Sequence, residues 1–306
     1  MQNWGNKRYH TLNYHLRQLF NAKVFKVAMD AGFTCPNRDG SKGVGGCAFC
    51  SPSGSGDFAG DRRLNVNEQF EQVKNVIHQK WPRALYLPYF QAFTNTYAPV
   101  DQLRELYYQA LEWPGVVGLS IGTRPDCLPN ETMDLLQELN EKTYLWLELG
   151  LQTIHPETSQ AMNLGYGFKD FLAAVSDLQD RGIRVCAHVI LGLPGEPRDM
   201  MMETAKEVAR LDLQGIKIHL LHVMRGTRLD RMYQEQGFRL LTRDEYISLV
   251  VDILEILPPE MVVHRLTGDS PRALLVGPEW SLKKWEILNG IDGELARRDT
   301  WQGKRA

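Results

Sequence analysis

The sequence has no long apolar run and few cysteines. It contains no stretch of eighteen apolar residues, which a membrane-spanning helix needs, and its first twenty residues lack the apolar core of a signal peptide. Five cysteines, three of them within residues 35–50, are an odd and uneven set that does not suggest a disulfide framework. These absences predict a cytoplasmic protein that neither crosses a membrane nor is exported.

A strong excess of one charge is also absent. The chain has 35 Lys and Arg against 37 Asp and Glu, a net charge of -2, so it is not a polycation built as a whole for nucleic acid. The charge is locally uneven, because residues 1–30 carry five basic side chains and one acid. This basic segment can contact phosphate groups, although a solvated surface is the simpler interpretation.

A unit of one short apolar strand followed by one amphipathic helix recurs along the chain. Six such units predict a parallel sheet with right-handed crossovers. Because six units are too few for a closed eight-stranded barrel, the pattern leaves an open partial barrel or a doubly wound α/β sheet. The expected strands are 23–33, 84–91, 116–123, 144–153, 184–193 and 215–223.

The two ends of the chain do not follow this pattern. Residues 1–22 form the basic extension, and residues 241–306 form a carboxyl-terminal element. In that element we expect a helix over 242–257, a short strand over 273–276 and a charged helical tail from Ser281. The repeating units between them, over 23–240, are the expected core domain.

Cys35, Cys47 and Cys50 lie in a loop rich in glycine and charge, directly after the first expected strand. A loop of this composition has no apolar face to bury, so its cysteines are expected to be metal ligands. Zinc would need a fourth ligand, and no other Cys or His lies in the loop, which favours an iron–sulfur cluster. Loops at the carboxyl ends of parallel strands commonly build active sites.

Together these features resemble the radical S-adenosylmethionine (SAM) superfamily, whose cluster loop follows the first strand of a partial (β/α)6 TIM-like barrel. Phe49 matches the aromatic residue usual before the last cysteine. Glu148-Leu-Gly-Leu-Gln152 is similar to the E-x-G-x-Q signature of the branch with the Elongator catalytic subunit and the coproporphyrinogen dehydrogenase-like enzymes. The resemblance implies a [4Fe–4S] cluster held by the three cysteines, which reductively cleaves SAM to methionine and a 5′-deoxyadenosyl radical.

The resemblance also implies which residues bind SAM. The segment from Tyr89 to Thr96 stands where the family has its second-strand motif, although the usual G-G-E is not present. HVILGLPGE resembles the fifth-strand glycine motif that lies against adenine. The eleven residues between Cys35 and Cys47, which include Arg38, are interpreted as a rim over SAM. The expected SAM-binding residues are Phe49, Gln91, Thr94, Arg124, Glu148, Gln152, His188, Ile190 and Gly192.

No motif identifies the catalytic residues, so these remain candidates. Cys127, in a loop after the third strand, is a candidate redox or hydrogen-donor residue. Lys217 and His219 share one face of the sixth strand, although a lone His on a strand is more often a core residue. Cys186 is expected to face away from His188 and to pack.

The amino-acid sequences of these motifs are most similar to those of the YhcC/YtqA-type (MnmL-like) radical SAM proteins, over residues 23–276. That group implies conversion of 5-carboxymethylaminomethyluridine to 5-aminomethyluridine at the tRNA wobble position, with a reductant such as flavodoxin or ferredoxin. A small metabolite or peptide substrate, and a structural zinc site, are the alternatives. The basic residues expected to contact tRNA phosphates are Lys7, Arg8, Arg17, Lys283, Lys284, Arg297 and Arg298.

Overall fold

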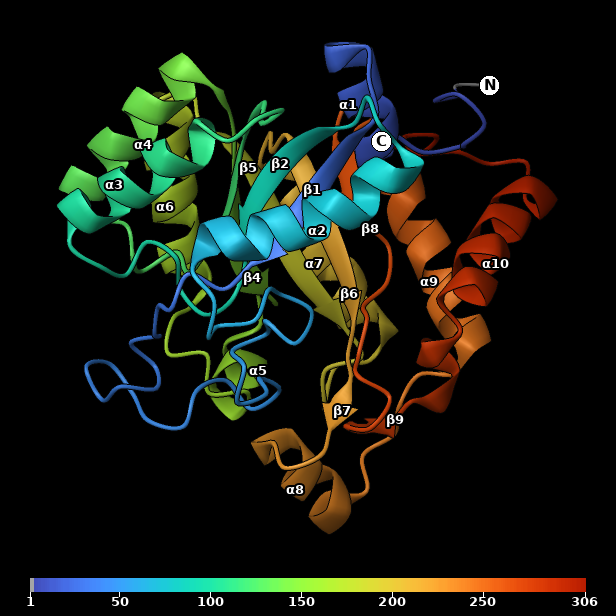
Figure 1. Cartoon of the computed structure of the whole chain (residues 1–306). Helices are drawn as coiled ribbons and strands as arrows, with labels where there is room; N and C mark the ends of the chain where they lie inside the picture. Colours follow the sequence, from blue (N-terminus) through green and yellow to red (C-terminus); the bar gives the residue numbers. More distant parts are fainter. Residues whose placement is uncertain (1–2) are drawn as a thin grey trace.

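Seven parallel strands form the central sheet of the computed structural model, which describes residues 3–306 (Figure 1). Their order across the sheet follows the chain, so each crossover places the next strand beside the last, as in a barrel. The strands are β1 (Val24–Met29), β2 (Leu85–Phe90), β3 (Gly118–Thr123), β4 (Tyr144–Gln152), β5 (Arg184–Leu191), β6 (Gly215–Leu220) and β8 (Val262–Arg265). The expected partial TIM-like barrel is confirmed, with a seventh strand beyond the six units.

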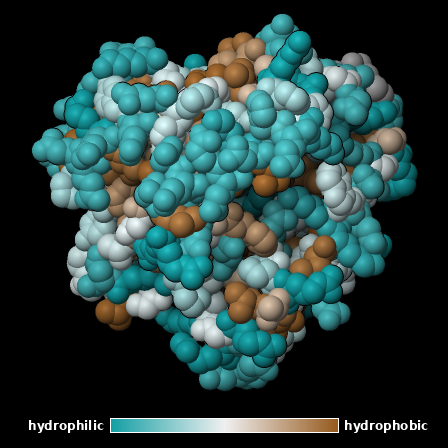
Figure 2. Space-filling model, in the orientation of Figure 1, coloured by the Kyte–Doolittle hydropathy of each residue, from teal (hydrophilic) through white to brown (hydrophobic). Residues whose placement is uncertain are grey.

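Helices between the strands cover the outside of the curled sheet (Figure 1). The helices are α1 (Leu12–Phe20), α2 (Val66–Lys80), α3 (Val100–Leu111), α4 (Asn130–Lys142), α5 (Pro156–Ala161), α6 (Phe168–Asp180), α7 (Arg198–Arg210), α8 (Arg228–Gln236), α9 (Arg243–Ile256) and α10 (Lys284–Arg297), with a short 3-10 helix at Glu279–Leu282. Within residues 3–306, none of them has the length and apolarity to span a bilayer. The face in Figure 2 is mostly hydrophilic, with hydrophobic residues in small groups.

Strand alternation separates an apolar outer layer from a mixed inner one. In β4, Leu145, Leu147 and Leu149 join the large core under the helices, whereas Trp146 and Glu148 belong to the barrel interior. Near the amino ends of the strands, Trp146 packs with an apolar set that closes the barrel, namely Leu16, Val24, Leu87, Cys186 and Val262. Polar side chains lie above this apolar layer, toward the carboxyl ends.

Cys186 belongs to that apolar layer and is fully buried. It therefore packs, as expected. The expectation that it faces away from His188 is wrong, because the two residues are two positions apart on one strand and both point into the barrel.

The carboxyl-terminal region contributes to the barrel and also extends beyond it. β8 lies within the predicted element 241–306, yet it pairs in parallel with β6. The expected sixth strand is interrupted after Leu220, and β7 (Val223–Met224) leaves the sheet to pair antiparallel with β9 (Leu275–Gly277). The boundary at residue 240 stays a prediction.

The amino-terminal extension packs against the carboxyl-terminal segment, and the first two of its residues 1–22 lie outside the described part. Thr11 bridges to Val263 of β8, and the Gln302 amide donates to the carbonyl of Arg8. Figure 1 places α1 and the carboxyl end of the chain at the end of the barrel opposite α5 and α8. The extension thus covers the edge of β8 near the amino ends of the strands.

Candidate active site

A cavity of about 420 Å³ opens at the carboxyl ends of the strands, beside the cysteine loop. All three cysteines of that loop line it. Among the expected SAM-binding and catalytic residues, those that line the cavity are Phe49, Gln91, Thr94, Arg124, Glu148, Gln152, His188, Ile190, Lys217 and His219. The fold therefore brings together residues from all seven strands of the sheet and from the loops that follow β1, β2 and β3.

Gly192 and Cys127 lie outside this lining. Gly192 has a φ of +89°, and a Cβ at this position would meet Leu241 at 3.3 Å. Cys127 is buried with its Sγ 3.7 Å from the Asp126 carboxylate, and burial raises the pKa of its thiol to about 12. The expected roles of Gly192 in SAM binding and of Cys127 as a redox or hydrogen-donor residue stay predictions.

Two polar side chains hold the cysteine loop in shape. Asn37 Nδ2 donates to the carbonyl of Asn163 at 2.6 Å and lies 3.7 Å from Cys47 Sγ. Arg38 donates to the carbonyls of Cys50 at 3.2 Å and Ser51 at 2.6 Å. The residues between the cysteines thus fix the positions of the thiols, which explains part of the long gap.

Glycine is required where this loop turns. Gly46 has a φ of +76°, and a Cβ there would lie 2.6 Å from Arg38 Nε. Because Gly46 has no side chain, the loop can pass under the side chain of Arg38.

The thiols of Cys47 and Cys50 share a hydrogen bond, which lowers the pKa of Cys50 and raises the pKa of Cys47. Hydrogen bonds from Cys47 and Ser55, together with nearby Arg38, lower the pKa of Cys50 to about 6. A thiolate is the form that ligates iron. Within residues 3–306, no group of three Cys, His, Asp or Glu side chains converges on one ion position. In a cluster each cysteine binds a different iron, so such convergence is not needed.

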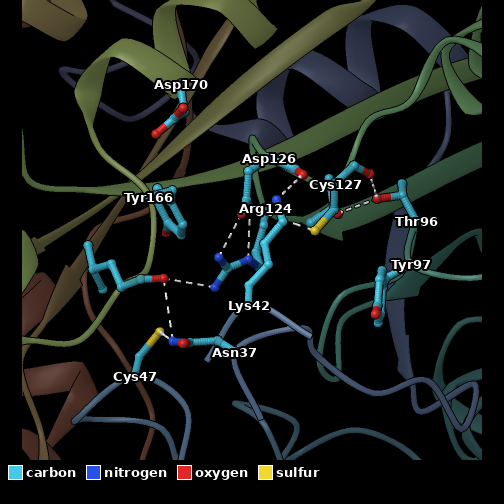
Figure 3. Close-up of polar contacts among 12 residues, drawn as sticks. Asn37, Lys42, Cys47, Thr96, Tyr97, Arg124, Asp126, Cys127, Tyr166 and Asp170 are labelled. Atoms are coloured by element: carbon cyan, nitrogen blue, oxygen red, sulfur yellow. Dashed lines mark hydrogen bonds and ion pairs between the residues drawn. The ribbon is translucent and has the colours of Figure 1, made fainter. Parts of the chain in front are cut away.

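Arg124 lies at the centre of a second group beside the thiols (Figure 3). Its guanidinium makes two hydrogen bonds of 2.9 Å to Asp126 and stacks over the Tyr166 ring at 4.7 Å. Lys42 also donates to Asp126, at 2.8 Å. Burial would raise the pKa of Asp126, but Arg124 and Lys42 hold it below its ordinary value. Arg124 thus pairs with an acid of its own loop, two residues further along the chain.

The far end of the cavity is closed by a floor network around Glu148, whose side chain is fully buried. Glu148 accepts hydrogen bonds from Lys217 at 2.9 Å, His188 at 2.7 Å and Ser120 at 2.7 Å, and it pairs with Lys26. The members of the floor network are Lys26, Tyr89, Ser120, Glu148, His188, Lys217 and His264.

Opposing effects set the charges of this network. Burial would raise the pKa of Glu148, but Lys217 and Lys26 hold it well below its ordinary value. Burial lowers the pKa of Lys217 to about 8, against the raising effect of Glu148. Burial likewise lowers the pKa of His188 to about 4, so this imidazole is neutral at pH 7. Both Glu148 oxygens are occupied by protein donors.

The E-x-G-x-Q segment bends at its glycine. A β-bulge separates Gly150 from Gln152, and Gln152 adopts a left-handed φ of 69°. A Cβ on Gly150 would lie 2.7 Å from Gln152 Nε2 and 3.0 Å from the Tyr166 hydroxyl. Glycine therefore lets the Gln152 amide fold over the strand and line the cavity.

The family models matched by this chain agree with the barrel. The model described as "Radical SAM superfamily" matches residues 35–208, and the one described as "Radical_SAM C-terminal domain" matches residues 213–297. The chain belongs to the radical SAM superfamily. It is 57% identical over 298 residues to the uncharacterized protein YtqA of Bacillus subtilis (strain 168), which covers 97% of this chain and 92% of that protein. The resemblance to the YhcC/YtqA-type group is confirmed.

More distant likenesses cover part of other radical SAM chains. A tRNA uridine(34) acetyltransferase of Methanocaldococcus jannaschii is 27% identical over 163 residues, which are 52% of this chain and 30% of that protein. The solved Elp3 of Methanocaldococcus infernus superposes with a TM-score of 0.64 at 20% identity, over 88% of this chain and 64% of that chain. This superposition shows that the fold is shared.

This protein is therefore a radical SAM iron–sulfur enzyme with a [4Fe–4S] cluster and SAM as cofactors. The donor set fits both, because three thiols and a polar cavity lie side by side. Sequence reasoning missed Lys26, His264 and Arg265 as parts of the site, and it named Tyr89 only as the start of the second-strand motif. Lys26, a charge inside the apolar strand VFKVAM, was the available signal for an inward-facing polar group.

Proposed function

We propose that this radical SAM enzyme converts 5-carboxymethylaminomethyluridine to 5-aminomethyluridine at the tRNA wobble position. The observation that carries the proposal is a sequence similarity. About half of this chain, 52%, aligns with a protein named tRNA uridine(34) acetyltransferase, and position 34 is the wobble base. The polar interior supports it, because a carboxylate- and amine-bearing side chain needs polar partners when it leaves water.

Cys35, Cys47 and Cys50 are the residues that would hold the cluster, with Asn37 and Arg38 fixing their loop. When bound, the cluster supplies an electron, drawn from a flavodoxin or ferredoxin, that cleaves SAM to methionine and a 5′-deoxyadenosyl radical. The protein's own contribution is to orient SAM and substrate and to exclude water.

Side chains at the open part of the cavity are the ones proposed to bind SAM. These side chains are uncharged and line the cavity, and they are Phe49, Gln91, Thr94, Gln152 and Ile190. Arg124 and Glu148, also expected to bind SAM, already have protein partners and are proposed to position the residues around them.

The surface proposed to contact tRNA needs revision. Lys7 and Arg8 pair with Asp292 and Asp299 of the chain's own carboxyl-terminal region. Lys283, Lys284, Arg297 and Arg298 also have acidic partners, which leaves Arg17 from the expected set.

Exposed arginines nearer the cavity are better placed for phosphates. Arg225, Arg228 and Arg231 follow β7, whose Met224 lines the cavity, and all three are exposed and without an ion pair in the described chain. Their spacing of three puts Arg228 and Arg231 on one side of α8. We propose this side of α8 as the phosphate-contacting surface.

Mass spectrometry of tRNA nucleosides tests the function. A strain lacking this gene should accumulate 5-carboxymethylaminomethyluridine, and the purified enzyme with SAM and reductant should convert it in isolated tRNA. An unchanged nucleoside profile, with SAM still cleaved in vitro, would refute the tRNA substrate and leave a small metabolite or peptide as the substrate class.

A further inference from the structure

One side of the cavity carries basic side chains in excess of its acids. We call it the basic wall, and it consists of Lys217, His219, His222 and Arg265. All four line the cavity and come from β6, from the residues just after it, and from β8. The rings of His188 and His219 lie 5.5 Å apart, so the wall continues into the floor network.

The charges around the wall do not balance. Lys26 and Lys217 share the single carboxylate Glu148. Arg265 and Lys284 share the single carboxylate Asp269, each at 2.8 Å. Counting Lys26 and Lys284, which lie behind the wall and outside the cavity lining, four cations thus share two carboxylates. Because an uncompensated charge is costly away from water, a group that brings negative charge is favoured here.

The wall also offers unused hydrogen-bonding capacity. His222 Nε2 is buried and has no hydrogen-bond partner within residues 3–306. A planar guanidinium such as that of Arg265 can donate to two oxygens of a carboxylate at once. Burial and the neighbouring Lys217 lower the pKa of His219 well below its ordinary value, so it acts as a neutral donor or acceptor.

We propose that the basic wall binds the carboxylate of the substrate's 5-carboxymethylaminomethyl group, an inference that rests on the proposed function. The wall would hold the end of the chain that is removed and would orient the adjacent methylene toward the SAM side of the cavity. A substrate with 5-aminomethyl, which lacks the carboxylate, would lose this anchor. The wall would then distinguish substrate from product.

A pair of small probes tests the wall without tRNA. N-benzylglycine carries the same CH2–NH–CH2–COO⁻ chain on a flat ring, and benzylamine is its counterpart without the carboxylate. Binding to the anaerobic holoenzyme with SAM is measured by ligand-observed NMR. The wild type should bind N-benzylglycine about tenfold more tightly than benzylamine, the expected gain from one charge-assisted contact.

Two variants locate the effect. Arg265→Gln and His219→Phe should each reduce or abolish the preference for N-benzylglycine and leave benzylamine binding unchanged. A third variant, Arg265→Lys, keeps the positive charge and should retain part of the preference. Arg272→Gln, at an exposed arginine outside the cavity lining, is the matched control and should keep the wild-type preference. Iron content and thermal unfolding show that each variant is folded.

Two results would overturn the inference. The first is equal binding of the two probes to the wild type, or an unchanged preference in both variants. The second is a parallel loss of SAM affinity in the variants, because the wall would then hold the carboxylate of SAM. Neither result depends on tRNA, so failure of the wobble-uridine assignment is detected separately by the nucleoside profile.

Discussion

The two ends of the cavity are built in contrasting ways. The cysteine end is a loop whose shape depends on glycines and on the backbone contacts of Asn37 and Arg38. The floor is built on strands, and its buried Glu148 is held by side chains from four other strands. A loop can be shaped around a cofactor, whereas strands fix charged groups rigidly. Function at one end and stability at the other should therefore separate under mutation.

Removal of a cluster ligand should give the largest effect. Cys47→Ala should lose nearly all bound iron and sulfide and all 5′-deoxyadenosine formation, with little change in the unfolding midpoint of the apoprotein. Cys186→Ala is the matched control, because Cys186 is buried in the apolar layer away from the loop. Iron analysis and visible absorption measure the outcome, and full iron content in Cys47→Ala would contradict the assignment.

Loss of the floor carboxylate should mainly affect stability. Glu148→Gln leaves Lys26 and Lys217 without their shared counter-charge, and breaking a buried ion pair costs about 3–5 kcal/mol. Ser120→Ala, which removes one neutral donor to Glu148, should cost only about 1 kcal/mol. Urea denaturation measures both. Equal costs would mean that Glu148 is not the central charge of the floor.

Acid should weaken the floor in two stages. The pKa of His188 is about 4 in the folded protein, below its ordinary 6.5, so stability is lost as the pH falls below 6.5, where the unfolded chain binds more protons. The pKa of Glu148 lies well below 4.5, so its contribution is present above that value and is lost as the pH falls through the folded pKa. Urea titrations across this range should show the second stage vanish in Glu148→Gln.

A methyl group at the bulge should give an intermediate effect on binding. Gly150→Ala would force apart the Gln152 amide and the Tyr166 hydroxyl, and such overpacking costs about 1–3 kcal/mol. We expect weaker SAM binding by equilibrium dialysis with the iron content retained. Gly293→Ala, where nothing lies within 4 Å, should leave SAM binding unchanged. Unchanged affinity in Gly150→Ala would remove Gln152 from the SAM site.

The smallest effect is expected at Cys127. Its thiol lies outside the cavity lining, so Cys127→Ala should change product formation by less than about twofold. Single-turnover assays with tRNA measure it. A large loss, with iron and SAM binding intact, would instead support the hydrogen-donor role suggested by its position in the sequence.

The sequence predicted what depends on local pattern. The motifs that resemble the family's included Glu148 and His188, which line the cavity, and the order of the segments put the cysteine loop directly after the first strand. The sequence did not predict which side chains contact one another inside the barrel, because these contacts depend on how far the sheet curls. Lys26 and His264 are 238 residues apart, yet their nitrogens lie 3.5 Å from each other. The seventh strand was missed as part of the sheet for a related reason, since only four residues of β8 carry its signal.

The meeting of Lys26 with Glu148 and His264 joins the two edge strands, β1 and β8, by side chains alone. A closed barrel joins such edges by a ladder of backbone hydrogen bonds, which fixes its bore. Here the two edges meet through the ionic contacts around one carboxylate and through the apolar layer beneath it, where Val24 and Val262 pack with Trp146. Separation of these two edges would therefore break side-chain contacts only and would leave every strand pairing of the sheet intact.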